Sequence, residues 1–113
     1  MTIKTYLGFD VGTKRTGIAI ANSLTAQANG IATVIHKKDG STNWIHLEEI
    51  IKRHSPNKFI VGLPFDQENK EQEMAFIAKS FGRKLGKRFS IDVVFVDEYL
   101  SSSEAKNQLK WHY

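Results

Sequence analysis

The feature that most constrains this chain is a short polar segment, Asp10-Val-Gly-Thr-Lys-Arg-Thr-Gly17, that lies between two apolar runs. Residues 6–9 and 16–21 are apolar, partly β-branched and of strand length, which predicts two adjacent antiparallel strands joined by a bend. Asp10 then lies at the end of the first strand, where a carboxylate is costly to bury without a cation, metal or hydrogen-bond partner. Asp and Gly are also ordinary turn residues, but the whole segment favours a site with chemistry at the bend.

The bend itself is rich in hydrogen-bond donors. Gly12 and Thr13 offer backbone and side-chain donors for a phosphate, while Lys14 and Arg15 add a point charge and a planar fork. We therefore interpret Gly12, Thr13, Lys14 and Arg15 as candidate nucleic-acid-binding residues, with an ordinary solvated turn as the alternative. His36 and Lys37 are expected at the end of the third strand that lies far from this bend.

The remaining chain changes from consecutive strands to alternating helices and strands. Apolar periodicity and turn residues predict an order of β-β-β-α-β-α-β-α, which implies an α/β fold with a mixed five-stranded sheet flanked by helices. Ser101 and Glu104 have the spacing of a capping box that opens the last helix. After the first hairpin, the expected elements are a strand at 30–36, a helix at 42–54, a strand at 58–64 that stops at Pro64, a helix at 68–87, a strand at 90–96 and a helix from Ser101.

Acidic residues follow two of the predicted strands. Asp10 ends the first strand and Asp97-Glu98 follow the fifth, so their carboxylates converge if both strands lie near the centre of one sheet. Carboxylates are preferred ligands of Mg²⁺ and Mn²⁺, and nucleases use such ions to activate water and to stabilise the leaving oxygen. Side chains alternate along a strand, so one of the pair faces Asp10. Glu98 is favoured and Asp97 stays a candidate; the alternative is a helix cap or a solvated strand end.

Composition supports a single small domain with a polyanionic partner. The chain has 113 residues, and its 16 Lys and Arg against 12 Asp and Glu give a net charge of +4. Cysteine is absent, and neither a signal peptide nor a membrane-spanning run is evident in the sequence, so we expect a cytoplasmic protein with one domain over residues 1–113. The oligomeric state is not fixed by the sequence; a monomer or a weak dimer fits it.

Three stretches together resemble the YqgF/RuvX family of ribonuclease H-like proteins. They are Gly8-Phe-Asp-Val-Gly-Thr-Lys-Arg-Thr-Gly-Ile-Ala19, Ile60-Val-Gly-Leu-Pro64 and Val96-Asp-Glu-Tyr-Leu-Ser-Ser102 followed by Glu104-Ala105. The family is described as Holliday junction resolvases and as nucleases that mature the 5′ end of the 16S ribosomal RNA precursor. The resemblance implies a metal-dependent endonuclease with Mg²⁺ or Mn²⁺ held by Asp10 and Glu98 or Asp97. It also implies nucleic-acid contacts at the bend and at Ser101 and Ser102, which are further expected to cap the last helix.

The chain departs from the family pattern in three places. The family's next helical segment, which carries a further active-site carboxylate, is expected to be missing after Tyr113, so we expect these 113 residues to cleave poorly. Tyr99 replaces a usual Arg. Gly62-Leu63 stand where many wider ribonuclease H-like nucleases have an acid, a departure that the family itself shares. Processing of ribosomal RNA is the favoured function. The alternatives are a DNA junction resolvase, an inactive nucleic-acid-binding domain and a nucleotide-phosphate hairpin like that of sugar kinases.

Overall fold

The computed structural model describes residues 3–25, 28–65 and 70–99 of the chain. Over these ranges the chain forms five strands and two helices in the order that the sequence predicts. The last helix, expected from Ser101, lies outside the described residues. The elements are β1 (Thr5–Val11), β2 (Arg15–Asn22), β3 (Ala28–Ile35), α1 (Trp44–His54), β4 (Lys58–Phe65), α2 (Lys70–Phe89) and β5 (Val93–Tyr99).

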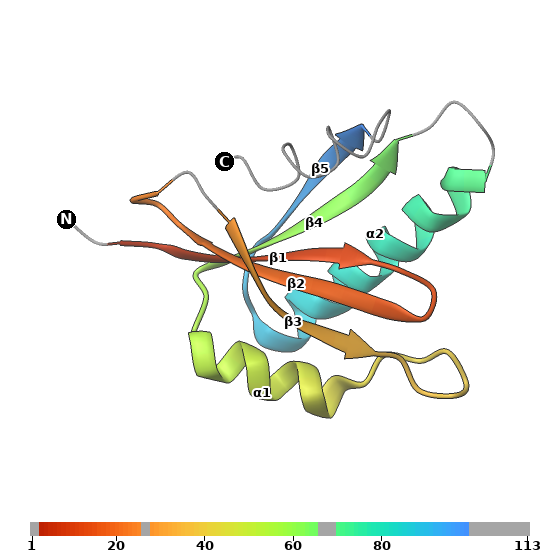
Figure 1. Ribbon diagram of the computed structural model, residues 1–113, viewed down its shortest axis with the longest axis horizontal. Coiled ribbons are helices and arrows are strands. Elements are labelled where there is room, and N and C mark those ends of the chain that lie inside the picture. The colour runs from red at the N-terminus through yellow and green to blue at the C-terminus, as the bar shows by residue number, and fades with distance from the viewer. Residues whose placement is uncertain (1–2, 26–27, 66–69, 100–113) are drawn as a thin grey trace.

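The strands form one mixed sheet with the order β3-β2-β1-β4-β5. β1 pairs with β2, and β2 with β3, in antiparallel fashion, whereas β1, β4 and β5 are parallel. The arrowheads of β1, β4 and β5 therefore point to the same edge of the sheet, where the bend between β1 and β2 also lies (Figure 1). We call this the carboxyl edge. The predicted mixed five-stranded sheet is confirmed.

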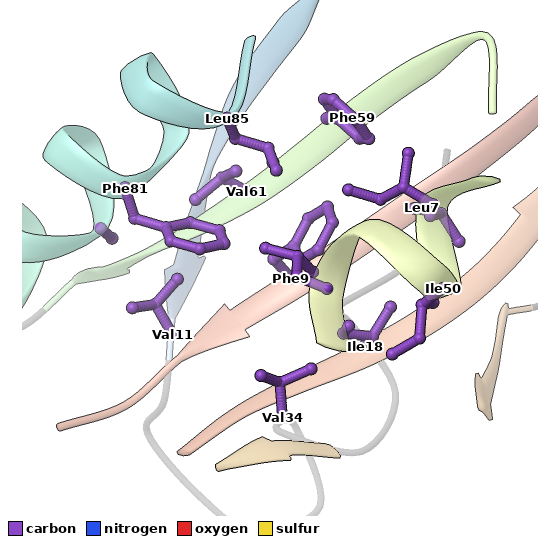
Figure 2. Close-up of a cluster of buried hydrophobic side chains, with 13 residues drawn as sticks. Leu7, Phe9, Val11, Ile18, Val34, Ile50, Phe59, Val61, Phe81 and Leu85 are labelled. Atoms are coloured by element: carbon purple, nitrogen blue, oxygen red, sulfur yellow. The ribbon is translucent and has the colours of Figure 1, made fainter. Parts of the chain in front are cut away.

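Both described helices pack on the same face of the sheet. Leu47, Ile50 and Ile51 of α1 and Ala78, Phe81 and Leu85 of α2 join one buried cluster with the strands. Figure 2 shows Phe9 of β1 at the centre of this cluster. Its ring centroid lies 5.6 Å from that of Phe59 and 5.5 Å from that of Phe81, in the tilted geometries that aromatic pairs favour. Apolar residues at helical spacing thus form the core, as the sequence predicts.

Two glycines let α2 approach the sheet closely. A Cβ atom on Gly82 would lie 2.5 Å from Cε1 of Phe95, and one on Gly86 would lie 2.7 Å from Cγ2 of Val93. Because real Cβ atoms do not come this close, side chains at these two positions would push helix and strand apart. The position of β5 in the molecule therefore depends on Gly82 and Gly86.

Several strand boundaries differ from the expectation; β1, for example, continues past Asp10 to Val11. β4 continues through Pro64 to Phe65, because beyond Val61 it pairs with β5 and no longer with β1, so no hydrogen bond to β1 is lost at the proline. β5 starts at Val93 and not at Ser90, because Ser90 has a φ of 55° and follows the end of α2. β5 also extends to Tyr99, so Asp97-Glu98 lie within the strand and not after it. No helix in the described ranges is long and apolar enough to cross a membrane.

Candidate active site

The bend between β1 and β2 requires glycine at its first position. The N–H of Gly12 donates to the carbonyl oxygen of Arg15 at 2.9 Å, which closes a turn around Thr13 and Lys14. A Cβ atom on Gly12 would lie 2.6 Å from that same oxygen. The predicted bend is thus confirmed, but Arg15 is the first residue of β2 and not part of an open loop.

Asp10 projects from the face of β1 opposite the hydrophobic core. Phe9 and Val11 are buried in the core, so the alternation of the strand places Asp10 on the other face, where its side chain is half-buried. Its partner in β2 is Gly17, which has no side chain to fill the space in front of it. The result is a hollow of about 300 Å³, here called the Asp10 hollow, which is lined by Asp10, Gly12, Arg15, Gly17 and Thr33.

A second glycine lies on the other side of Asp10. The register pairs Phe9 with Val61, and Gly62 with Val96, so Gly62 is level with Asp10 on β4. Asp10 therefore lies between two positions without side chains, Gly17 and Gly62. The sequence analysis treated Gly62 as a departure from a wider nuclease pattern and missed this role. The role depends on strand register, and the local sequence gives no signal for it.

The strand register also separates the two acids of β5. Asp97 pairs with Leu63, and Glu98 pairs with Pro64. Phe9, Val61 and Phe95 occupy one row across the sheet. Because positions along a strand alternate between the two faces, Glu98 occupies a position on the same face as Asp10, and Asp97 occupies one on the same face as Phe95. β1 and β5 are separated by two strand spacings, or roughly 10 Å, at the same edge. β5 is the outermost strand of the described sheet and not a strand near its centre, as the expectation required. Its parallel direction still brings the backbone of both acids to the edge that carries Asp10.

The cations of the bend do not all face the same way. Arg15 is exposed and lines the Asp10 hollow, while Lys14 is exposed and is not among the residues that line it. The carbonyl oxygen of Lys14 accepts a hydrogen bond of 2.9 Å from the backbone N–H of His36. The expectation that His36 and Lys37 lie far from the bend is therefore wrong, because β3 runs antiparallel to β2 and ends beside its first residue.

His36 and Thr16 form a polar pair that the sequence analysis did not identify. Thr16 is 2% exposed, and its Oγ1 lies 3.0 Å from Nε2 of His36. The pair lies on the helix-covered side of the sheet, opposite Asp10, because Thr16 pairs with Val11. Nδ1 of His36 is buried and has no hydrogen-bond partner among the described residues. His36 therefore packs at the edge of the core.

The remaining site predictions fall outside what the structure describes. Ser101 and Ser102 lie beyond residue 99, so their nucleic-acid contacts and their helix cap stay predictions. Among the side chains that the structure describes, no three His, Cys, Asp or Glu lie close enough together to hold a metal ion. The side chains of Asp97 and Glu98 are not among these, so the metal site stays a prediction.

Curated proteins are similar to this chain over most of its length. A protein of Saccharophagus degradans named "Putative pre-16S rRNA nuclease" is 42% identical over 111 residues, which cover 98% of this chain and 77% of that protein. A protein of Coxiella burnetii with the same name is 40% identical over 102 residues, which cover 90% of this chain and 72% of that protein.

Solved structures and a family model agree with these relatives. RuvC of T. thermophilus in complex with a Holliday junction substrate superposes with a TM-score of 0.59 at 16% identity and covers 83% of this chain and 63% of that chain. This likeness confirms the ribonuclease H-like fold. The model of a family described as "RuvX: Holliday junction resolvase" matches residues 4–113. The resemblance and the nuclease class predicted from the motifs are thus confirmed, and the chain belongs to the RuvX family.

Proposed function

We propose that this chain is a metal-dependent endonuclease of structured nucleic acid, and that its substrate is the 5′ end of the 16S ribosomal RNA precursor. The names of its relatives from Saccharophagus degradans and Coxiella burnetii, both "Putative pre-16S rRNA nuclease", support the substrate. The placement of Asp10 carries the chemical part of the proposal. This half-buried carboxylate lies between Gly17 and Gly62, at the edge to which the parallel strand β5 brings Asp97 and Glu98.

The residues at the carboxyl edge fit a divalent metal ion. Carboxylate oxygens are the protein ligands that Mg²⁺ and Mn²⁺ prefer, and the hollow beside Asp10 is open to a phosphate oxygen and to water. Asp10 and Glu98, or Asp97 in its place, would hold the ion. Such an ion, when bound, supplies an activated water and stabilises charge on the phosphodiester.

The other residues of the Asp10 hollow are suited to holding the substrate backbone. Arg15 presents a planar guanidinium that can bind two oxygens of one phosphate. The exposed ammonium group of Lys14 adds electrostatic attraction at the same bend. Gly17 leaves space for a phosphate beside Asp10, because no side chain projects from that position. These contacts fix the position of a strand and do not read its bases, so substrate choice depends on shape.

Cleavage by the Asp10→Asn variant tests the proposal. We expect it to lose about 100-fold or more in rate on a precursor RNA with a 16S 5′ leader in Mg²⁺ or Mn²⁺, because the variant lacks one of the carboxylates that would hold the charge-stabilising metal ion. Asp92→Asn is the matched control, since Asp92 is exposed and lies just before β5 at the opposite end of that strand. Equal rates for Asp10→Asn and the wild type would refute the proposal. A four-way DNA junction is the second substrate, and cleavage of the junction alone would identify a resolvase.

The two acids of β5 are distinguished by a second pair of variants. We expect Glu98→Gln to reduce cleavage more than Asp97→Asn, because Glu98 occupies a strand position on the same face of the sheet as Asp10. Both substitutions keep the shape of the side chain and remove its charge. Initial rates over a range of Mn²⁺ concentrations measure the difference. A larger loss in Asp97→Asn would assign the ligand to Asp97 and show that β5 turns its other face to Asp10.

A further inference from the structure

A second hollow lies on the helix-covered side of the same bend. It has a volume of about 340 Å³, which is large enough for a phosphate group with several waters. Val11, Trp44 and Phe81 contribute its apolar wall, and the core also contains Val11 and Phe81. We call it the Lys84 hollow; its lining also includes Gly12, Thr13, His36, Thr42 and Lys84.

The polar side of the Lys84 hollow favours an anion. The exposed ammonium group of Lys84 comes from α2, and the hydroxyl-bearing residues Thr13 and Thr42 come from the bend and from the segment before α1. Among the described residues, no Asp or Glu lines this hollow, in contrast to the hollow that contains Asp10. Asp39 lies close in sequence, but its Oδ1 already accepts hydrogen bonds from the backbone N–H and the hydroxyl of Ser41.

Stacking of a nucleobase in this hollow is not favoured. One face of the Trp44 ring is stacked on Phe81, with centroids 6.0 Å apart and an interplanar angle of 10°. The guanidinium of Arg88 lies 4.9 Å from the centroid of the same ring. Because Trp44 already has these two partners, the hollow offers charge and hydroxyl groups more readily than an aromatic surface.

The two hollows are linked through the bend. Gly12 lines both of them, so one side of the bend faces Asp10 and the other faces Lys84. The positive charge continues along α2, where Lys87 and Arg88 are exposed. A strand that crosses the bend would therefore place one phosphate beside Asp10 and meet a second positive site beyond it.

We propose that the Lys84 hollow binds a phosphate of the nucleic-acid strand at a position flanking the one cut at Asp10. This inference rests on the proposed function, because the scissile phosphate defines which phosphate is flanking. Lys84 neutralises the flanking phosphate, and Thr13 and Thr42 supply hydroxyl donors. The site then contributes to affinity and to strand register without reading sequence.

Binding of a labelled single-stranded RNA in the presence of a chelator tests the inference without cleavage. Lys84→Gln is expected to weaken binding about five-fold near 0.1 M salt and to lower the slope of log affinity against log salt by about 0.7, as one lost phosphate contact does on a single strand. Lys79→Gln is the matched control, because Lys79 is an exposed lysine of the same helix that does not line the hollow. Equal effects of the two variants would mean diffuse attraction and would overturn the proposal.

Titration with inorganic phosphate tests the hollow independently of any nuclease activity. We expect the amide signals of Thr13, His36 and Thr42 to shift in NMR spectra of the wild type and to stay unchanged in Lys84→Gln. Shifts elsewhere in the described chain would overturn the assignment of the site. A free nucleoside triphosphate that binds more tightly than a short oligonucleotide would overturn the choice of a nucleic-acid strand as the ligand. If Asp10→Asn still cleaves RNA while the phosphate-induced amide shifts are unchanged, the proposed function is refuted and the phosphate site in the Lys84 hollow is not.

Discussion

The setting of Asp10 is created by residues without side chains. Gly17 and Gly62 flank it across the sheet, and Gly12 follows it at the bend. Of these, Gly12 is required by close packing, since a Cβ atom there would lie 2.6 Å from a backbone oxygen. Gly17 is different, because its Cβ atom would lie 3.9 Å from Cβ of Asp10, which is an ordinary contact. Gly12 therefore determines the shape of the bend, and Gly17 determines the space in front of the carboxylate.

Replacing Gly12 is expected to damage both stability and function. Gly12→Ala forces the backbone of Arg15 to move, and we expect the free energy of unfolding to fall by about 1 to 3 kcal/mol. Cleavage should fall further than stability explains, because Arg15 and Thr13 move with the bend. Urea denaturation and initial rates at a temperature where both proteins are folded measure the two effects.

Gly30→Ala provides the control for this substitution. Gly30 lies in β3, and a Cβ atom there has no heavy atom within 4 Å, so we expect a change within about 0.5 kcal/mol. If the two variants unfold at the same urea concentration, the bend tolerates a side chain at Gly12 and the steric argument is wrong.

Local pattern was sufficient to predict the elements but not their register. Apolar spacing predicts α1 and α2, and a run of apolar residues predicts β4, because each signal lies within a few residues of sequence. The end of β4 beyond Pro64 and the start of β5 depend on which strands pair, and such pairing joins residues far apart in the chain. The same reason explains the error at His36, whose place beside Lys14 follows from the β2 and β3 pairing.

The candidate site was predictable to the extent that it depends on strand ends. The sequence placed Asp10 and the pair Asp97-Glu98 at one edge, because the carboxyl ends of parallel strands meet there. It could not place the hollow beside Asp10, since Thr33 and Gly17 reach it through pairing of three strands. The face of the sheet to which the Glu98 position belongs likewise depends on the register between β4 and β5.

The contact between α2 and β5 is expected to be sensitive to a single methyl group. Gly82→Ala adds about 1 kcal/mol of helix propensity, but its Cβ atom meets the ring of Phe95 at 2.5 Å. We expect a net loss of about 1 to 3 kcal/mol in the free energy of unfolding, together with slower cleavage, because β5 carries Asp97 and Glu98. Arg83→Ala, at an exposed position of the same helix, serves as the control. A more stable Gly82→Ala protein would contradict the proposed packing constraint.

The described surface carries exposed lysines and arginines that can attract a polyanion. The chain carries a net charge of +4, and Lys52 and Glu48 form an ion pair of 3.0 Å on an exposed face of α1. Exposed ion pairs of this kind contribute little to stability. The exposed lysines and arginines elsewhere in the described ranges can attract a nucleic-acid backbone at a salt-dependent rate.

Binding of a metal ion is expected to stabilise the whole fold through the Asp10 site. At a Mn²⁺ concentration about ten times the dissociation constant, linkage gives a gain of about 1.4 kcal/mol. For a domain of this size this corresponds to a rise in Tm of roughly 5 to 10 °C. Thermal unfolding of the wild type and of Asp10→Asn, with and without Mn²⁺, measures it. A rise of the same size in Asp10→Asn would place the metal elsewhere.

The stacked arrangement around Trp44 provides the protein with an internal optical probe. The indole stacks on Phe81 of α2, has the guanidinium of Arg88 over its ring, and lies at the wall of the Lys84 hollow. Its emission is therefore sensitive both to the docking of α1 against α2 and to a charged group entering the hollow. With Trp111 replaced by Phe, a fluorescence titration follows occupancy of that hollow in real time, while the same signal on heating reports the separation of the two helices.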